Sequence, residues 1–547
     1  MPRLALLLLC AAYVLPGLFA RDPWRGADLS AFGQMLAIAE GRAPWWQPTL
    51  GGVTTDAALL PHWLGALSIM ATQPWLDAAL AARLPFALLL VLTLTAVWYA
   101  CFHFAMSDAA QPLPLAFGGE APAKDYARAV ADGALLALIA TLGLLQMGHE
   151  TTPELAQLAA AASWQWALAA APRRGKRSKV GLLLSLPALA ACGAPVIALV
   201  LGLGALLLCW RGPTPQTRRL VPWLVTAMAL AALAAWPTRS WAWRVSAHLD
   251  VTALVRLWLW FLWPGWLLAA WTLWRWRRHL LHWHIAVPGL ALTTALAASA
   301  GMGASEHALM LALPGIAVLA AFALPTLQRG ASAAIDWFTV FFFTACALTI
   351  WVMYAAMQTG YPAQPAANVL KLAPGFQPRW SAAESALALV GTLAWAWLVR
   401  WRTGRHREAL WKSLVLPAGG VALCWLLLMT LWLPLLDYAR SNRPLAMRLL
   451  PRLPAGACVA APGAPPSLVA ALEWHARRRV DARPTALTDA ACPVLVVVQR
   501  GEAPSAELRR AQAEGWQVIA REQRPTERQE WTLVLQRAGA PPLKPSR

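Results

Sequence analysis

Pairs of carboxylates occur where apolar segments of the chain end. Asp22 and Asp28 lie in RDPWRGADLSAFGQML, directly after the apolar run LALLLLCAAYVLPGLFA, and Glu150 and Glu154 lie in HETTPE between two further apolar runs. A carboxylate at such a place can take a proton from a substrate hydroxyl or orient it. The competing interpretations are structural, because Asp28 suits a helix N-cap and Glu154 suits the first turn of a helix.

An anionic substrate group would need cations on the same face as these acids. We favour Arg83, Arg244 and His307, because each lies near the end of an apolar run. The whole set of basic residues expected on this face is Arg25, Arg42, His62, Arg83, His149, Arg239, Arg244, His248, His307, Lys371 and Arg379.

A metal centre is the alternative for part of this set. Asp56, His62 and His149 could hold a divalent metal together, but they lack the tight ligand spacing that usually marks such a site. We therefore expect no metal and no other cofactor.

The composition points to a membrane protein. Of the 547 residues, 59% are hydrophobic and only 13% are charged, whereas soluble proteins average about 25% charged residues. Apolar segments of about 20 residues can instead span a bilayer. The net charge of +20 lies in short clusters between apolar runs, which is typical of cytoplasmic loops and not of a nucleic-acid-binding surface. Many of the 33 Trp would then lie at the membrane interface.

The apolar runs predict about thirteen membrane-spanning helices between residues 3 and 434. Every second run is followed by a basic cluster: RRGKRSK, RGPTPQTRR, RWRRH, QRG and RWRTGRHR. This alternation places the N-terminus inside, and it places loop 21–82 and everything after about residue 434 outside. The first 20 residues contain the first predicted span, at about 3–20. They could instead be a cleaved signal peptide, but a polytopic chain needs none.

The segments predicted outside have structure of their own. Leu29, Phe32, Met35, Leu36 and Ala39 recur at helical spacing, which predicts a short amphipathic helix on the membrane surface. Residues 435–547 alternate the strand patterns CVAAP, PVLVVVQ, WQVIAR and WTLVLQ with helical stretches, as in a small α/β domain. Its two cysteines, Cys458 and Cys492, would pair in an oxidising compartment.

These motifs together resemble a known family. The features that carry the resemblance are a first span, a loop that opens with an acid and a helix ending in ML, and the segments GG…D…LLPHWLGAL and ARLPFALL. The chain resembles the polytopic GT-C glycosyltransferases, above all the lipid A aminoarabinose transferases and the protein O-mannosyltransferases. The resemblance implies a sugar donor carried on polyprenyl phosphate and a glycolipid, glycan or protein as acceptor.

The resemblance also assigns residues. The first-loop acid of the family corresponds to Asp28, with Asp22 as the other register, and the second acid corresponds to Glu154 or to the nearby Glu150. The acid of the relatives' FEKPPL motif corresponds to Asp56, but Ala57 replaces the lysine that follows it, which leaves the sugar and acceptor open.

The prediction is therefore a glycosyltransferase of the bacterial inner membrane. A mostly α-helical catalytic domain, residues 1–434, would include loop 21–82, and residues 435–547 would form a periplasmic α/β domain. The alternative is a transporter or flippase of a lipid-linked sugar, since charges within spans mark transport paths. The runs show no internal repeat and few charges, which speaks against a transporter. The long first loop with its surface helix and the folded outer domain favour the enzyme.

Overall fold

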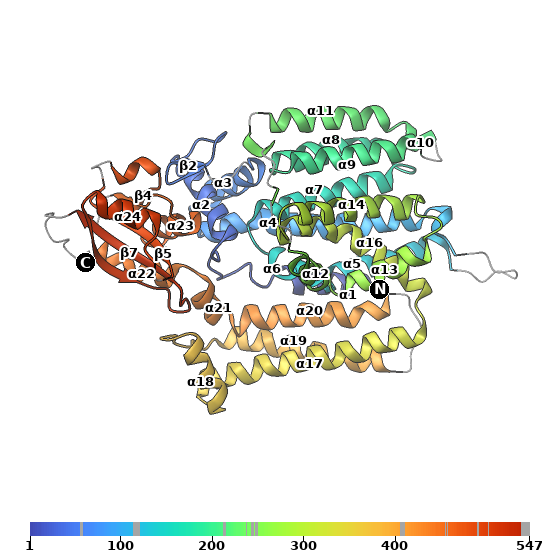
Figure 1. Ribbon diagram of the computed structural model, residues 1–547. Coiled ribbons are helices and arrows are strands. Elements are labelled where there is room, and N and C mark those ends of the chain that lie inside the picture. Colours follow the sequence, from blue (N-terminus) through green and yellow to red (C-terminus); the bar gives the residue numbers. More distant parts are fainter. Residues whose placement is uncertain are drawn as a thin grey trace. The chain divides into compact units, whose positions relative to one another are not determined.

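The computed structural model describes the chain except residues 55–57, 113–120, 212–214, 237, 242–244, 247–249, 405–410, 455, 457, 489–491, 502 and 538–547. It divides into two compact units (Figure 1). We call Met1–Phe19, Pro85–Ile350 and Ala382–Thr430 the helical unit, and Ala20–Leu84, Trp351–Ser381 and Leu431–Arg547 the α/β unit. Each unit therefore combines segments that lie far apart in the sequence.

Helices account for the regular structure of the helical unit. Two long helices, α4 (Ala78–Ala105) and α17 (Arg329–Thr359), begin or end in the other unit. The remaining α-helices are α1 (Arg3–Val14), α5 (Ala123–Ala140), α6 (Leu142–Met147), α7 (Pro153–Ala170), α8 (Gly175–Ala191), α9 (Pro195–Trp210), α10 (Pro215–Arg218), α11 (Val221–Ala235), α12 (Val251–Phe261), α13 (Gly265–Arg275), α14 (Trp283–Gly301), α15 (Glu306–Leu309), α16 (Leu313–Ala323), α19 (Ala382–Thr403) and α20 (Lys412–Thr430).

Each predicted span coincides with one of these helices or with a consecutive pair. Within the described part of the chain, seven helices are long and apolar enough to cross a membrane, or up to eight if α12 and α13, bent by 95°, count as one broken span. The chain is thus a multi-pass membrane protein, while the number thirteen stays a prediction. Helix α1 ends at Val14 and is shorter than the predicted span 3–20, because Pro16 lacks the N–H that a continued helix needs. Gly17, with a φ of 81°, then turns the chain.

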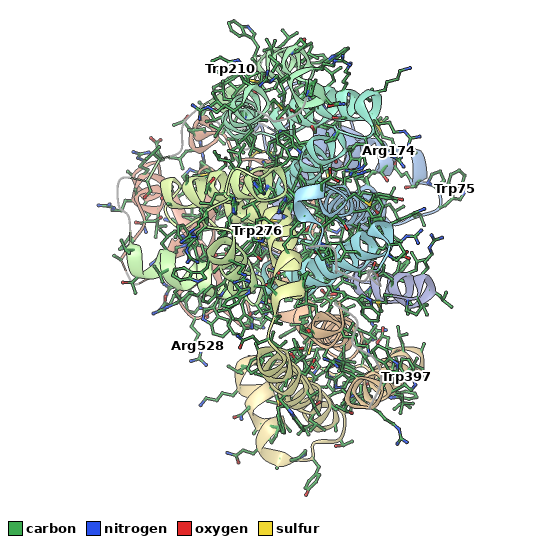
Figure 2. The ribbon with its side chains drawn as sticks, turned by 90° about the vertical axis from the view of Figure 1, so that its right-hand side faces the viewer. Trp75, Arg174, Trp210, Trp276, Trp397 and Arg528 are labelled. Carbon is green, nitrogen blue, oxygen red and sulfur yellow. A yellow bond between two sulfur atoms is a disulfide. The ribbon has the colours of Figure 1, made fainter. Side chains whose placement is uncertain are left out.

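The surface of the helical unit suits a lipid environment. Leucine and tryptophan side chains point outward along many helices, and Figure 2 shows Trp210 and Trp397 projecting from the ribbon. Helix α16, in contrast, is buried on all sides, and a Cβ added at its Gly315 would lie 2.5 Å from the carbonyl oxygen of Pro288 on α14. Such close contact between backbones is typical of helix packing in membranes.

A five-stranded sheet forms the centre of the α/β unit, in the order β4-β3-β5-β7-β6. Strand β3 pairs in parallel with β4 and β5, and β7 pairs antiparallel with β5 and β6. The unit comprises α2 (Ala27–Ala39), β1 (Thr49–Leu50), β2 (Val53–Thr54), α3 (Leu60–Thr72), α18 (Ala363–Leu372), α21 (Leu433–Arg440), α22 (Arg443–Leu449), β3 (Cys458–Ala460), α23 (Pro466–Trp474), β4 (Arg479–Asp481), β5 (Val494–Arg500), α24 (Ala506–Ala513), β6 (Trp516–Glu522) and β7 (Glu530–Arg537).

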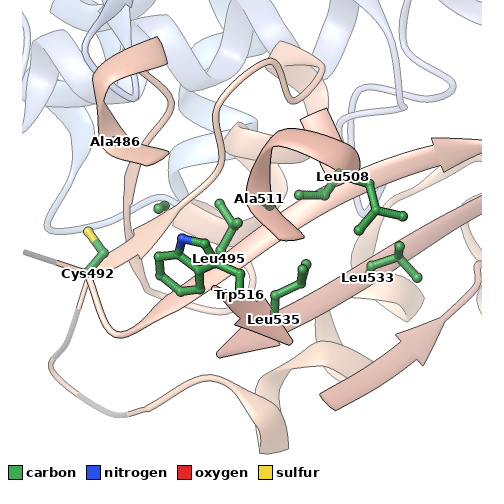
Figure 3. Packing of buried hydrophobic residues seen from close by; sticks show 10 residues of the cluster. Ala486, Cys492, Leu495, Leu508, Ala511, Trp516, Leu533 and Leu535 are labelled. Atoms are coloured by element: carbon green, nitrogen blue, oxygen red, sulfur yellow. The ribbon is translucent and has the colours of Figure 1, made fainter. Parts of the chain in front are cut away.

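The four predicted strands are confirmed as β3, β5, β6 and β7. Strand β4 was not predicted, because it is only three residues long and the first of them, Arg479, ends a pattern typical of one long helix, whereas α23 stops at Trp474. One face of the sheet buries Leu495, Trp516, Leu533 and Leu535 under α24 (Figure 3). The disulfide between Cys458 and Cys492 is confirmed, and their Cα atoms lie 5.0 Å apart.

Helix α2 is largely buried inside the α/β unit. It packs between α3 and α23, and ten of its thirteen residues are buried. Phe32 meets the ring of Trp474 edge to face at 5.2 Å, and a Cβ on Gly33 would lie 2.6 Å from the Cβ of Ala470. The predicted helix is therefore present, but its apolar spacing reflects packing contacts on both sides, one of them with the C-terminal segment. Its place at a membrane surface stays a prediction.

Candidate active site

Asp28 holds the turn that precedes α2. Gly26, with a φ of 93°, occupies the N-cap position, so the N-cap interpretation of Asp28 is wrong. One carboxylate oxygen, Oδ2, accepts a hydrogen bond from the backbone N–H of Trp24 at 3.0 Å and lies 3.4 Å from Nη2 of Arg21. Both side chains of this ion pair are buried. Burial of an ion pair favours a positioning role, because a substrate would have to displace Arg21 to reach the carboxylate.

Asp22 contacts a carboxylate that the sequence did not single out. Asp437 on α21 accepts a hydrogen bond from the indole N–H of Trp24 at 2.8 Å and another from the backbone N–H of Asp22 at 3.2 Å. The Asp22 carboxylate in turn accepts from Nη2 of Arg443 at 2.7 Å. Three acids, Asp22, Asp28 and Asp437, are thus connected through residues of one short stretch. The signal for Asp437 was present in LWLPLLDYAR, an acid shortly after the last apolar run.

Asp437 is adapted to exchange a proton near neutral pH. Burial raises the pKa of Asp437 to about 7, and the charge of Asp22 adds to the rise, while the hydrogen bonds from Trp24 and Asp22 and the charge of Arg21 oppose it. A proton acceptor works best when its pKa lies near the working pH. The raised pKa makes Asp437 a candidate proton acceptor.

Cations surround the same stretch. The guanidinium groups of Arg21 and Arg440 lie 4.8 and 5.0 Å from the centre of the Trp24 ring. Arg83, in the part of α4 that belongs to this unit, is buried and within electrostatic reach of Asp22, Asp28 and Asp437. The structure thus brings the predicted phosphate-binding Arg83 together with the predicted acids. The predicted His62 is fully buried on α3.

Four predicted residues, Glu150, Glu154, His149 and His307, lie in the helical unit. Glu154 is in the first turn of α7 after the N-cap Thr152, as the structural interpretation expected. Its Oε1 lies 3.8 Å from Nδ1 of His307, and both side chains are partly exposed. Two residues predicted separately as acid and phosphate ligand therefore form a pair.

Glu150 and His149 are held by their neighbours in the turn before α7. Glu150 is buried and accepts a hydrogen bond from Gln146 at 2.7 Å. The two ring nitrogens of His149 lie 2.7 and 2.8 Å from the carbonyl oxygens of Leu145 and Tyr13, and the ring packs on Trp425. These contacts fix the turn that precedes Glu154.

Three predicted residues, Asp56, Arg244 and His248, lie outside the residues that the structure describes. Among the described residues, no three or more His, Cys, Asp or Glu side chains are grouped as metal ligands would be. The alternative metal site would consist of Asp56, His62 and His149. Asp56 is not among the described residues, and His62 and His149 belong to different units.

The apolar helices, together with an α/β unit that contains the acid-bearing first loop, form the polytopic GT-C architecture that the sequence resembles. The structure is similar to that of ArnT from Cupriavidus metallidurans bound to undecaprenyl phosphate, with a TM-score of 0.65 and 12% identity over 98% of each chain. It is also similar to the same protein in the apo state, with a TM-score of 0.60 and 14% identity over 97% of this chain and 96% of that chain.

The predicted fold class is confirmed by this likeness, which extends over almost the whole chain. No protein-family model matches the sequence, and no curated protein matches it significantly.

Proposed function

We propose that this protein is an integral-membrane glycosyltransferase that moves a sugar from a polyprenyl-phosphate carrier to an envelope acceptor. The observation that supports this most is the likeness of nearly the whole chain to ArnT, which was crystallised with undecaprenyl phosphate. In this proposal the protein lies in the bacterial inner membrane, and the α/β unit faces the periplasm, where it meets a glycolipid, glycan or protein acceptor.

The basic residues of the α/β unit would bind the phosphate of the donor. Arg83 is the leading candidate, because it is buried among charges and its guanidinium can donate several hydrogen bonds to phosphate oxygens. Arg21, which is held by Asp28, lies in the same charge cluster. Positive charge at this place stabilises the phosphate as it leaves the sugar.

Asp437 would be the proton acceptor of the transfer. In the proposed step, an acceptor hydroxyl oxygen bonds to the anomeric carbon, the bond from that carbon to the phosphate oxygen breaks, and the hydroxyl proton passes to the carboxylate. Asp437 suits this step because its pKa of about 7 balances deprotonation against basicity. Asp22, whose backbone N–H donates to Asp437, would position the Asp437 carboxylate. Asp28 would position the neighbouring residues of the same stretch.

The Glu154–His307 pair is the corresponding candidate of the helical unit. Both side chains of the pair are partly exposed, unlike the buried Glu150. We assign it to orienting a hydroxyl or phosphate group of a substrate. Glu150 and His149 would support the turn that carries it.

The decisive experiment measures release of free polyprenyl phosphate. Purified protein in lipid vesicles would receive an undecaprenyl-phosphate-linked sugar and envelope glycolipid extract, and mass spectrometry would follow both the carrier and the glycosylated acceptor. Transfer predicts both products in equal amounts. An Arg83→Gln variant should lose most of this release, whereas Arg528→Gln, at an exposed arginine, should keep it. Movement of intact donor across the bilayer without release would identify a flippase instead.

A further inference from the structure

A separate cavity lies within the α/β unit. Its volume is about 270 Å³, below the range of about 300–1,000 Å³ that is common for sites of drug-sized ligands. Arg25 and Gly26, at the start of α2, line part of it, and the other lining residues include Asn442, Ser467, Arg524 and residues of β5 and β7. Its size suits a small polar group.

The charges that line this cavity are not balanced. Three arginines, Arg25, Arg500 and Arg524, face two glutamates, Glu527 and Glu530. Glu527 is shared, because Nη1 of Arg25 and Nη2 of Arg524 each lie 3.2 Å from the same oxygen, Oε2. Arg500 pairs with Glu530 at 2.9 Å. Two guanidinium groups therefore share one carboxylate, and one positive charge is left in excess.

Arg524 is the residue that this excess affects most. It is only 6% exposed, and its Nη1 has no hydrogen-bond partner among the residues that the structure describes. Burial lowers the pKa of Arg524, and the charge of Arg25 lowers it further. A buried guanidinium N–H without an acceptor is costly, and an anion in the cavity would relieve that cost.

The start of α2 adds a second source of positive potential. Gly26 is the N-cap of this thirteen-residue helix, has no side chain and lines the cavity. The first backbone N–H groups of a helix point toward an anion placed at its N-terminus. The charges, the unpartnered Nη1 and the helix terminus thus favour the same kind of ligand.

We propose that this cavity is a binding site for a phosphate group, distinct from the proposed transfer site and independent of the proposed function. Arg524 and Arg25 donate hydrogen bonds to the phosphate oxygens, and the start of α2 stabilises its charge. The phosphate belongs either to a free small phosphate ester or to the headgroup of an anionic phospholipid.

The test separates these two sources. Calorimetric titration of the protein in a neutral detergent with inorganic phosphate and with glycerol phosphate measures free ligands. Native mass spectrometry after incubation with phosphatidylglycerol or phosphatidylcholine measures bound lipid. We expect one bound phosphate or one bound phosphatidylglycerol per chain, weakened about 10- to 100-fold in Arg524→Gln through the loss of a charged hydrogen bond.

Arg528→Gln is the matched control, since it removes the same charge from an exposed arginine nearby, and it should bind like the wild type. If Arg524→Gln does not fold, Arg500→Gln, at a side chain 75% exposed, should weaken binding less but measurably. Binding of free phosphate identifies a soluble ligand, and binding of phosphatidylglycerol alone identifies a lipid headgroup. No binding of either, or equal binding by the wild type and all variants, would overturn the proposal.

Discussion

At the scale of single residues, the contacts of Asp28 favour a structural role over a catalytic one. Its carboxylate bonds to the N–H of Trp24 and pairs with Arg21. In Asp28→Asn the amide oxygen can still accept from Trp24, but Arg21 loses the buried carboxylate that pairs with it. We expect the free energy of unfolding to fall by about 3–5 kcal/mol, as for other broken buried pairs, measured by urea unfolding in mixed micelles.

The control for this variant lies at the other end of α2. Glu40 pairs with Arg42 at 2.7 Å on the surface, so Glu40→Gln should cost at most about 1 kcal/mol. If Asp28→Asn is as stable as the control and transfer is nevertheless lost, Asp28 acts on the substrate directly and the positioning role is wrong.

Asp437 allows a pH test of the proposed transfer. A base must be deprotonated, and the pKa of Asp437 is raised to about 7. Transfer to a hydroxyl acceptor should therefore fall about tenfold per pH unit below 7 and level off above it. Asp437→Asn should lower the rate by about 10²- to 10⁴-fold and abolish this dependence.

Asp250→Asn is the matched control for the same chemical change. Asp250 caps α12 by accepting from the N–H of Ala253, and asparagine caps a helix equally well. Its pH profile should match that of the wild type. A profile for Asp437→Asn that keeps its acid limb would assign the base to another group.

At the scale of elements, the contact of α2 with α23 is the point where the first loop joins the C-terminal segment. Gly33→Ala should destabilise the protein by about 1–3 kcal/mol through overpacking, since the new Cβ would lie 2.6 Å from that of Ala470. Gly289→Ala, in the middle of α14, meets nothing within 4 Å and should be neutral or slightly stabilising. Thermal unfolding of both variants in one detergent compares them directly, and equal midpoints would contradict this packing.

At the scale of the whole molecule, the basic clusters predict the orientation in the membrane. A reporter that is active only outside the cytoplasm should be active when fused after Arg547 and inactive when fused after Arg174, within the RRGKRSK cluster. A stable but inactive fusion at Arg547 would place the α/β unit inside and remove the proposed periplasmic acceptors with it.

The sequence alone determined the features that depend on local composition. The apolar run 83–105 forms most of helix α4, and the alternating segment WTLVLQ forms most of strand β7. Both could be predicted because hydrophobic periodicity depends only on residues close in the sequence. The acids of the first loop and Glu154 could be predicted as candidates from their positions at the ends of apolar runs.

Only the tertiary structure decided which of these residues meet. Asp437 lies 415 residues from Asp22, and the hydrogen bond between them follows from packing that no local pattern records. The same holds for α2, whose spacing reads as a surface helix until the C-terminal α23 covers its other side. Local sequence sets where a helix begins and which faces are apolar, but burial, and with it the raised pKa of Asp437, depends on segments that come together only in the fold.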